Sequence, residues 1–157
     1  MKPSDRVQAA LDARNLTIRV IEFPASTATA EEAAAAAGCE LGAIVKSLLF
    51  LVDGRPILVL VAGDRMADAR RIGARFGVGK KKVRLADAET VRQVTSYDVG
   101  GVPPIGHPVA LTTLIDDSLA RFETVWAAAG TANAVFPIPY RLLLTLTSGE
   151  VYGVGPG

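Results

Sequence analysis

The residues best suited to chemistry in this chain are a lysine within an apolar segment and a loop rich in glycine and proline. Lys46 lies inside the run IVKSLLF (44–50), where strand alternation puts it on the face shared by Leu48 and Phe50. An ammonium group there needs an anion, a carbonyl dipole or solvent, because burying it without a partner is costly. Lys46 is thus a candidate ligand-binding cation. The alternative is a lysine whose stem lies on the sheet while its amine reaches water.

The main chain of the segment TSYDVGGVPPIGHP (95–108) is the second candidate group. Glycine or proline stands at Gly100, Gly101, Pro103, Pro104, Gly106 and Pro108. Proline fixes the backbone and glycine lets it approach a ligand closely, so we expect a stiff loop with exposed amides. Such amides can hold a carbonyl or phosphate oxygen. On composition alone, a structural turn between two sheet segments is the favoured alternative.

The remaining reactive side chains are few. His107 is the only histidine, and its imidazole can assist proton transfer near neutral pH. Between Gly106 and Pro108, however, it is more simply a loop residue whose ring hydrogen-bonds to the backbone. We interpret Cys39, the only cysteine, as a small packing residue and Trp126 as part of the core. One histidine and one cysteine provide no zinc ligand cluster, so we expect no metal and no cofactor.

The formal net charge of +1 hides a basic segment. Residues 65–84 hold eight Lys or Arg residues against the single Asp68, a local charge of +7 that leaves −6 for the rest of the chain. Such a segment can bind a polyanion such as RNA. The candidate RNA-binding residues are Arg70, Arg71, Arg75, Lys80, Lys81 and Lys82. Alternatively, the arginines complement a helix dipole and the lysines solvate a turn.

The elements that would position these groups follow from hydrophobic periodicity, caps and turns. Helices are expected over 5–14, from Thr27 or Thr29 to Gly38, over 64–76, after Asp87 and over 139–146. Strands are expected over 17–23, 44–52, 56–62, 83–86, 109–113, 121–129, 135–136 and 151–154. Asp116 and Asp117 should cap a short helical turn, and the Asp53-Gly54 turn should join a hairpin in the middle of the sheet. We therefore predict one α+β (mixed α/β) domain over 1–157, with a largely antiparallel central sheet and surrounding helices.

The sequence gives no sign of membrane association. Its start, MKPSDR, has no apolar stretch of the signal-peptide type. Lys46, Asp53 and Arg55 interrupt the most apolar runs before they could span a bilayer. We therefore expect a cytoplasmic protein with no membrane partner.

Several stretches spread along the chain carry a family resemblance. They are VKSL (45–48), FG (76–77), TSY (95–97), GGVPPIGH (100–107), IDDSL (115–119) and VWAAAG (125–130). In this order and spacing they resemble the YbaK/ProX family, the prolyl-tRNA-synthetase-associated or INS-type aminoacyl-tRNA editing domain. The family's lysine falls on Lys46, and its glycine-to-proline loop falls on Gly100 through Pro104. The chain departs from the pattern at Ser96, where many members have glycine, and at Ile21, near which some members have tyrosine.

The resemblance implies a trans-editing deacylase that hydrolyses the ester of a mischarged tRNA, with the 3′ end of aminoacyl-tRNA as its partner. A synthetase is a further expected partner. Lys46 and the amides of Gly100 and Gly101 are the expected catalytic groups, aided by the substrate's own ribose hydroxyl. The expected substrate-binding residues are Val102, Pro103, Pro104, Gly106, His107 and Gly130. No side chain is an obvious general base, which also fits the alternative, a catalytically silent protein of this fold that binds tRNA or a synthetase.

Overall fold

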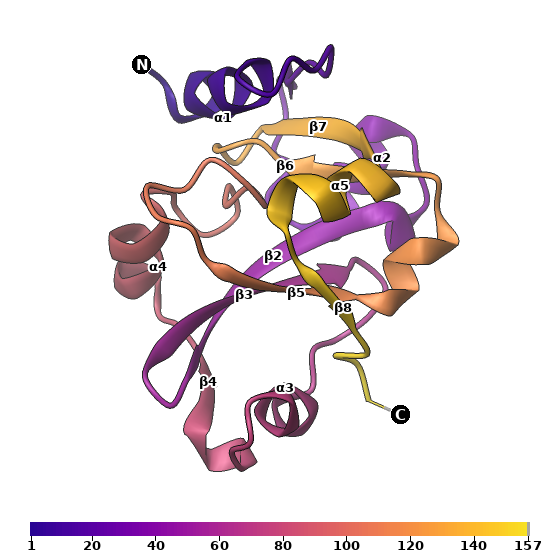
Figure 1. Cartoon of the computed structure of the whole chain (residues 1–157). Coiled ribbons are helices and arrows are strands. Elements are labelled where there is room, and N and C mark those ends of the chain that lie inside the picture. The colour runs from indigo at the N-terminus through magenta and orange to yellow at the C-terminus, as the bar shows by residue number, and fades with distance from the viewer. Residues whose placement is uncertain (157) are drawn as a thin grey trace.

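The computed structural model describes residues 1–156 and consists of a mixed sheet with helices on both faces (Figure 1). The helices are α1 (Pro3–Asp12), α2 (Ala30–Ala37), α3 (Ala69–Arg75), α4 (Ala88–Thr95) and α5 (Tyr140–Thr147). Short 3-10 turns are η1 (Leu41–Ala43), η2 (Lys80–Lys82) and η3 (Asp117–Arg121). The strands are β1 (Ile21–Glu22), β2 (Ile44–Val52), β3 (Arg55–Ala62), β4 (Val83–Leu85), β5 (Thr112–Asp116), β6 (Thr124–Ala128), β7 (Ala134–Pro139) and β8 (Glu150–Tyr152). The predicted α+β class is confirmed.

The β2–β3 hairpin occupies the middle of the sheet, as predicted. The strand order is β1-β7-β6-β2-β3-β5-β8, with β4 also paired to β2. Antiparallel ladders join β1 to β7, β7 to β6, and β2 to both β3 and β4, whereas β2–β6, β3–β5 and β5–β8 are parallel. Asp53 and Gly54 turn the hairpin with φ angles of 51° and 80°, and these left-handed conformations match the right-handed twist of the flanking strands.

Two strands share one edge of β2, and they leave a gap between them. β6 pairs with Ile44 and Val45, and β4 pairs with residues 50–52. Between these ladders, no strand of the described chain pairs with residues 46–49 on this edge, although β3 pairs with them on the other. The carbonyl of Leu49 instead accepts a hydrogen bond from the Ala86 N–H at 2.9 Å. Backbone groups in such a gap are free to meet loops or ligands.

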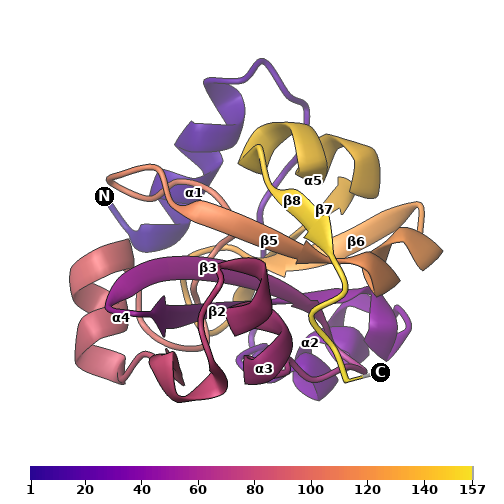
Figure 2. The same cartoon turned by 60° about the horizontal axis from the view of Figure 1, so that its bottom comes forward.

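Helices bury both faces of the sheet, as Figure 2 shows from a second direction. On one face, Val7 and Leu11 of α1, Val91 of α4 and Leu143 of α5 join the largest core cluster. On the other face, Ile72 of α3 packs in a second cluster, and α2 forms a smaller cluster of its own. Alternate residues of β2 enter different clusters, so a residue of this strand that is not apolar stands out.

Several element ends follow the local signals. Thr29 caps α2 by accepting a hydrogen bond from the Glu32 N–H at 3.1 Å, and Gly38 ends the helix with a φ of 70°. Asp87 caps α4, and Asp116 caps η3, both as predicted. None of the helices described within residues 1–156 has the length and apolar character needed to cross a membrane.

Other predicted ends were wrong. The strand expected over 17–23 shrinks to Ile21–Glu22, because only these two residues pair with β7. The helix expected from residue 5 begins at Pro3, which suits the first turn of a helix. Ser4 lies inside this turn, and its hydroxyl donates to Glu22 Oε1 at 3.0 Å. The helix expected from residue 64 begins after Asp68, whose side chain accepts from the Arg70 N–H.

Candidate functional site

A cavity of about 380 Å³ lies beside the unpaired part of β2. Lys46, Ser47 and Leu49 line it from β2, and Gly100 and Val102 line it from the loop. Most of the remaining wall comes from the start of α2 and the residues before it (27–31), from residues 126–128 of β6, and from residues 85–86 at the end of β4. The structure therefore brings the candidate lysine and part of the candidate loop to one cavity.

Lys46 is half-buried, and its amine is held by a neutral group. Nζ donates a hydrogen bond to the carbonyl oxygen of Arg65 at 2.7 Å. Asp64, which precedes Arg65, accepts two hydrogen bonds from Arg121, at 2.8 and 3.0 Å. These bonds hold the pKa of the Asp64 carboxyl below its usual range. Because a carbonyl is a weaker partner for an ammonium group than an anion, a phosphate or a polarised ester can replace it.

Ser47 is a site residue that the sequence analysis missed. Its Oγ is buried and has no hydrogen-bond partner in the described chain. Strand alternation places Ser47 on the face of Val45 and Leu49, where its hydroxyl interrupts an apolar row, and this interruption was the available signal. A buried hydroxyl without a partner costs about 1–3 kcal/mol. Ser47 places this cost in the wall of the cavity.

The two adjacent glycines of the loop, Gly100 and Gly101, have different roles. Gly100 lines the cavity with a φ of 92°, and its N–H makes no hydrogen bond to another group in residues 1–156. Gly101 does not line the cavity, and its N–H donates to the Asp98 carbonyl at 3.0 Å. The amide of Gly101, predicted to hold the ester carbonyl, is therefore already engaged within the turn. Its carbonyl accepts from the Gly130 N–H at 2.8 Å, so Gly130 supports the loop from outside the cavity.

The rest of the loop lies away from Lys46. Pro104, Gly106 and His107 line a separate groove of about 560 Å³, and Pro103 is buried beside them. The ring Nε2 of His107 lies 2.8 Å from the Pro103 carbonyl oxygen, and burial lowers the pKa of the imidazole. The structure thus does not bring the predicted substrate contacts at Pro103, Pro104, Gly106 and His107 to the cavity. Together with Gly130, they brace the loop.

The ring of Tyr97 anchors the part of the loop that lies away from Lys46. Tyr97 is 2% exposed, and its hydroxyl donates to the Gly106 carbonyl at 2.9 Å. The guanidinium of Arg6 in α1 lies 4.7 Å from the centre of the Tyr97 ring and donates to the Ser96 carbonyl. These contacts fix both ends of the loop, so Gly100 and Val102 are presented to the cavity on a rigid support.

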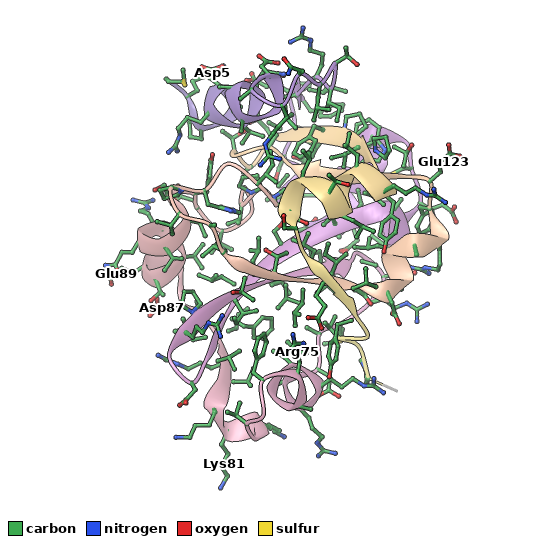
Figure 3. The ribbon with its side chains drawn as sticks, in the orientation of Figure 1. Asp5, Arg75, Lys81, Asp87, Glu89 and Glu123 are labelled. Atoms are coloured by element: carbon green, nitrogen blue, oxygen red, sulfur yellow. The ribbon has the colours of Figure 1, made fainter. Side chains whose placement is uncertain are left out.

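The predicted RNA-binding cations are all exposed, on α3 (Arg70, Arg71, Arg75) and on η2 (Lys80, Lys81, Lys82). Figure 3 shows Lys81 projecting outward from the η2 turn. Arg75 is already paired with Glu150 at 2.5 Å, so its guanidinium is less available to bind a phosphate. From η2 the chain runs through β4 directly to Leu85, which lines the cavity, so the lysines and the cavity are linked by one short strand.

Trp126 and Cys39 differ in how they fit their predicted roles. Trp126 is only half-buried and lines the cavity, so it is not purely a core residue. Cys39 packs beside α2, and burial raises the pKa of its thiol, as expected for a packing residue. Within residues 1–156 there is no group of three His, Cys, Asp or Glu side chains arranged to hold a metal ion.

Comparisons with known proteins give a consistent result. A family model described as the aminoacyl-tRNA editing domain matches residues 24–146. The chain is similar to the uncharacterized protein YwhH of Bacillus subtilis, with 34% identity over 134 residues, covering 85% of this chain and 83% of that protein. It is also similar to the proline–tRNA ligase of Maridesulfovibrio salexigens, with 35% identity over 100 residues, or 64% of this chain. The chain spans only 17% of that ligase.

Solved structures share the fold over the whole chain. A candidate trans-editing enzyme for prolyl tRNA synthetase superposes with a TM-score of 0.93 and 40% identity, covering 100% of this chain and 99% of that one. The hypothetical protein APE2540 superposes with a TM-score of 0.87 and 32% identity, covering 96% and 99% of the two chains.

Proposed function

The chain belongs to the aminoacyl-tRNA editing domain family, and from this premise we propose that it is a trans-editing aminoacyl-tRNA deacylase. The reaction is hydrolysis of the ester between a wrongly attached amino acid and the terminal ribose of tRNA. The observation that carries the proposal is that Lys46, Ser47, Gly100 and Val102 line one cavity. A cation, a hydroxyl and main-chain amides are the groups that an ester carbonyl and a nearby phosphate require.

Each group has a role in this proposal. The N–H of Gly100 donates to the ester carbonyl as negative charge develops on its oxygen. Lys46 exchanges its bond with the Arg65 carbonyl, now 2.7 Å long, for the aminoacyl group or the terminal phosphate. Ser47 Oγ gives its unused hydrogen bond to the bound ester, which positions the carbonyl carbon for attack.

The attacking water needs little help from protein side chains. Water adds to the carbonyl carbon, the bond from that carbon to the ribose oxygen breaks, and the proton released by the water passes to the ribose oxygen. The adjacent ribose hydroxyl of the substrate orients the water and relays this proton. Glu31 is the one carboxylate among the residues that line the cavity, and it is exposed at the start of α2. In this mechanism Glu31 is not the general base.

The substrate tRNA is inferred from the relatives. The similar proteins include proline–tRNA ligases and a candidate trans-editing enzyme for prolyl tRNA synthetase. We infer that tRNA charged by a prolyl synthetase with the wrong amino acid is the first substrate to try. The cavity wall consists mostly of small aliphatic residues, including Ala28, Ala86 and Ala127, which favours an uncharged amino acid side chain.

The experiment is a turnover assay of the pure protein on a panel of mischarged tRNAs. Release of the amino acid from at least one of them is expected. If the ribose hydroxyl next to the ester of that substrate is replaced by hydrogen, wild type should no longer hydrolyse it. The Glu31→Gln variant should retain most of the wild-type activity on the unmodified substrate. Full activity on the deoxy substrate together with loss in Glu31→Gln would replace the substrate-assisted mechanism by general-base catalysis. Failure on every tRNA would overturn the deacylase proposal.

The same proposal assigns the tRNA backbone to the lysines of η2. Changing Lys80, Lys81 and Lys82 together to Gln should weaken tRNA binding and flatten its salt dependence, because each lost phosphate contact lowers the log–log slope by about 0.7–0.9. Lys2→Gln is the matched control, since Lys2 is an exposed lysine in a surface ion pair with Glu22. An unchanged slope in the triple variant would mean that these lysines only solvate the turn.

A catalytically silent tRNA- or synthetase-binding protein is the second candidate. It is favoured by the internal bonds already made by the Lys46 amine and the Gly101 amide, at 2.7 and 3.0 Å. A silent protein would bind tRNA with the same salt dependence, so only turnover separates the two functions.

A further inference from the structure

Two large aliphatic side chains at the cavity are left in solvent. Leu85, the last residue of β4, is 58% exposed, and Val99, next to Gly100, is 65% exposed. Both line the cavity, although they come from different segments of the chain. Single exposed apolar residues are common on protein surfaces, but two that line the same cavity and stay exposed call for an apolar partner.

The backbone holds both residues in place. Leu85 is paired with Phe50 of β2, and the following Ala86 N–H donates to the Leu49 carbonyl at 2.9 Å. Val99 follows Asp98, whose carboxylate accepts a hydrogen bond from Arg92 at 2.7 Å and whose carbonyl accepts one from Gly101. Both residues are therefore held by an ordered backbone, and each presents an exposed aliphatic side chain to the same cavity.

We propose that Leu85 and Val99 bind the base of the terminal adenosine of tRNA by apolar contact with the faces of the ring. This inference rests on the proposed function, because it takes the reacting ester to lie at Lys46 and Gly100. The ester is attached to the ribose of that nucleotide, so its base must lie within one sugar of the cavity. Every base has an apolar face, and stacking on that face is a common means of holding single-stranded nucleic acid.

The charges next to Leu85 favour RNA over an apolar peptide. The exposed cations Lys80, Lys81, Lys82 and Arg84 directly precede Leu85, in η2 and β4. An RNA strand can place the phosphates before its last nucleotide on these cations and its last base on the aliphatic pair. A purely apolar protein segment would have no use for this row of charge.

The test compares Leu85→Ala, Val99→Ala and the double variant on two esters of the same amino acid, the 3′-O-aminoacyl adenosine and the matching 3-O-aminoacyl ester of methyl ribofuranoside, which keeps the neighbouring hydroxyl but has no base. The amino acid is the one that wild type removes fastest from tRNA. We expect each single variant to lower the preference for the adenosine ester, measured as the ratio of kcat/KM values, about tenfold, mainly through KM. Val109→Ala is the matched control, because Val109 is 60% exposed but lines no part of this cavity.

Equal losses on both esters would overturn the inference, because the two residues would then shape the amino acid pocket. So would kcat/KM values that stay at the wild-type level on both esters. Binding of the unacylated trinucleotide CCA, followed by NMR of the Leu85 and Val99 methyl groups, separates the two proposals. If CCA shifts these methyl signals but the protein hydrolyses no mischarged tRNA, the proposed base site stands and the proposed deacylase activity is rejected. If the protein hydrolyses a mischarged tRNA but CCA shifts neither methyl signal, the deacylase activity stands and the base site is rejected.

Discussion

The cavity side and the supporting side of the glycine- and proline-rich loop differ in how the polar groups there are satisfied. On the part that braces the loop, His107, Tyr97 and Gly101 all have internal hydrogen-bond partners. At the cavity, the Gly100 N–H and the Ser47 hydroxyl have none within the described chain. Since folded proteins rarely leave buried polar groups unpaired, the buried Ser47 hydroxyl marks the cavity side, whereas the paired groups of the loop belong to its support.

Lys46→Ala gives the largest expected effect on the cavity side. Deacylation of the best mischarged tRNA should fall about 100-fold, as when a single charge-stabilising group is removed from an ester-hydrolysing site. The circular dichroism spectrum and melting temperature should stay close to wild type, because the lost bond to Arg65 is at the surface. Lys2→Ala controls for the loss of a lysine elsewhere. Full activity of Lys46→Ala would remove this residue from the site.

Gly101→Ala gives the largest expected effect on the supporting side. A Cβ at this position would lie 2.9 Å from backbone atoms of Gly130, so the two segments must move apart. We expect a loss of about 1–3 kcal/mol in the free energy of unfolding, together with reduced activity. Gly79→Ala is the control, since nothing lies within 4 Å of its Cβ position. If the two variants melt at the same temperature, the close contact with Gly130 is not needed.

Removing one hydroxyl from each side gives a direct comparison. Tyr97→Phe deletes the bond to the Gly106 carbonyl and should cost about 1 kcal/mol of stability in denaturant unfolding. Its activity should fall only as far as the loop loosens. A stability equal to wild type would show that this bond does not hold the loop.

Ser47→Ala should behave in the opposite way. Its hydroxyl has no partner, so the variant should be as stable as wild type or slightly more stable. Its deacylation rate should nevertheless drop about tenfold, which corresponds to one lost hydrogen bond of about 1.4 kcal/mol in the transition state. Destabilisation with unchanged turnover would assign Ser47 to the core.

His107 provides the smallest test, in the pH dependence of stability. Burial holds the pKa of its ring below the ordinary value of 6.5 in the folded protein. As the pH falls below 6.5, the unfolded chain binds a proton more readily than the folded one, so the free energy of unfolding decreases. His107→Asn should lose this dependence on pH. Because the chain has one histidine, NMR of the ring gives the pKa directly, and a value above 6.5 would contradict the burial argument.

Local signals predicted much of the fold but little of how the site is assembled. The capping residues Thr29 and Asp87 and the turn at Gly54 act within a few residues, so the sequence displays them. The limits of β1 depend on β7, more than a hundred residues away, and local propensity does not contain that information. Lys46 could be found because a lysine is conspicuous in an apolar strand.

The gap between β4 and β6 could not be found in this way. It arises because two strands distant in sequence approach the same edge of β2. The distinction between the amides of Gly100 and Gly101 likewise exists only in the folded turn, where the Gly101 N–H donates to the Asp98 carbonyl and Gly130 donates to the Gly101 carbonyl. Composition could therefore identify the loop but not which of its amides is free.

Helix α1 lies outside the family match, which begins at residue 24, yet it touches the loop directly. Arg6 covers the Tyr97 ring, and the Pro3 carbonyl oxygen would be 2.7 Å from a side chain at Gly130. A truncation to residues 24–146 would thus remove the helix that packs against Tyr97 and against Gly130. The shortened protein would keep every residue of the cavity wall but lose the helix that supports the loop from behind.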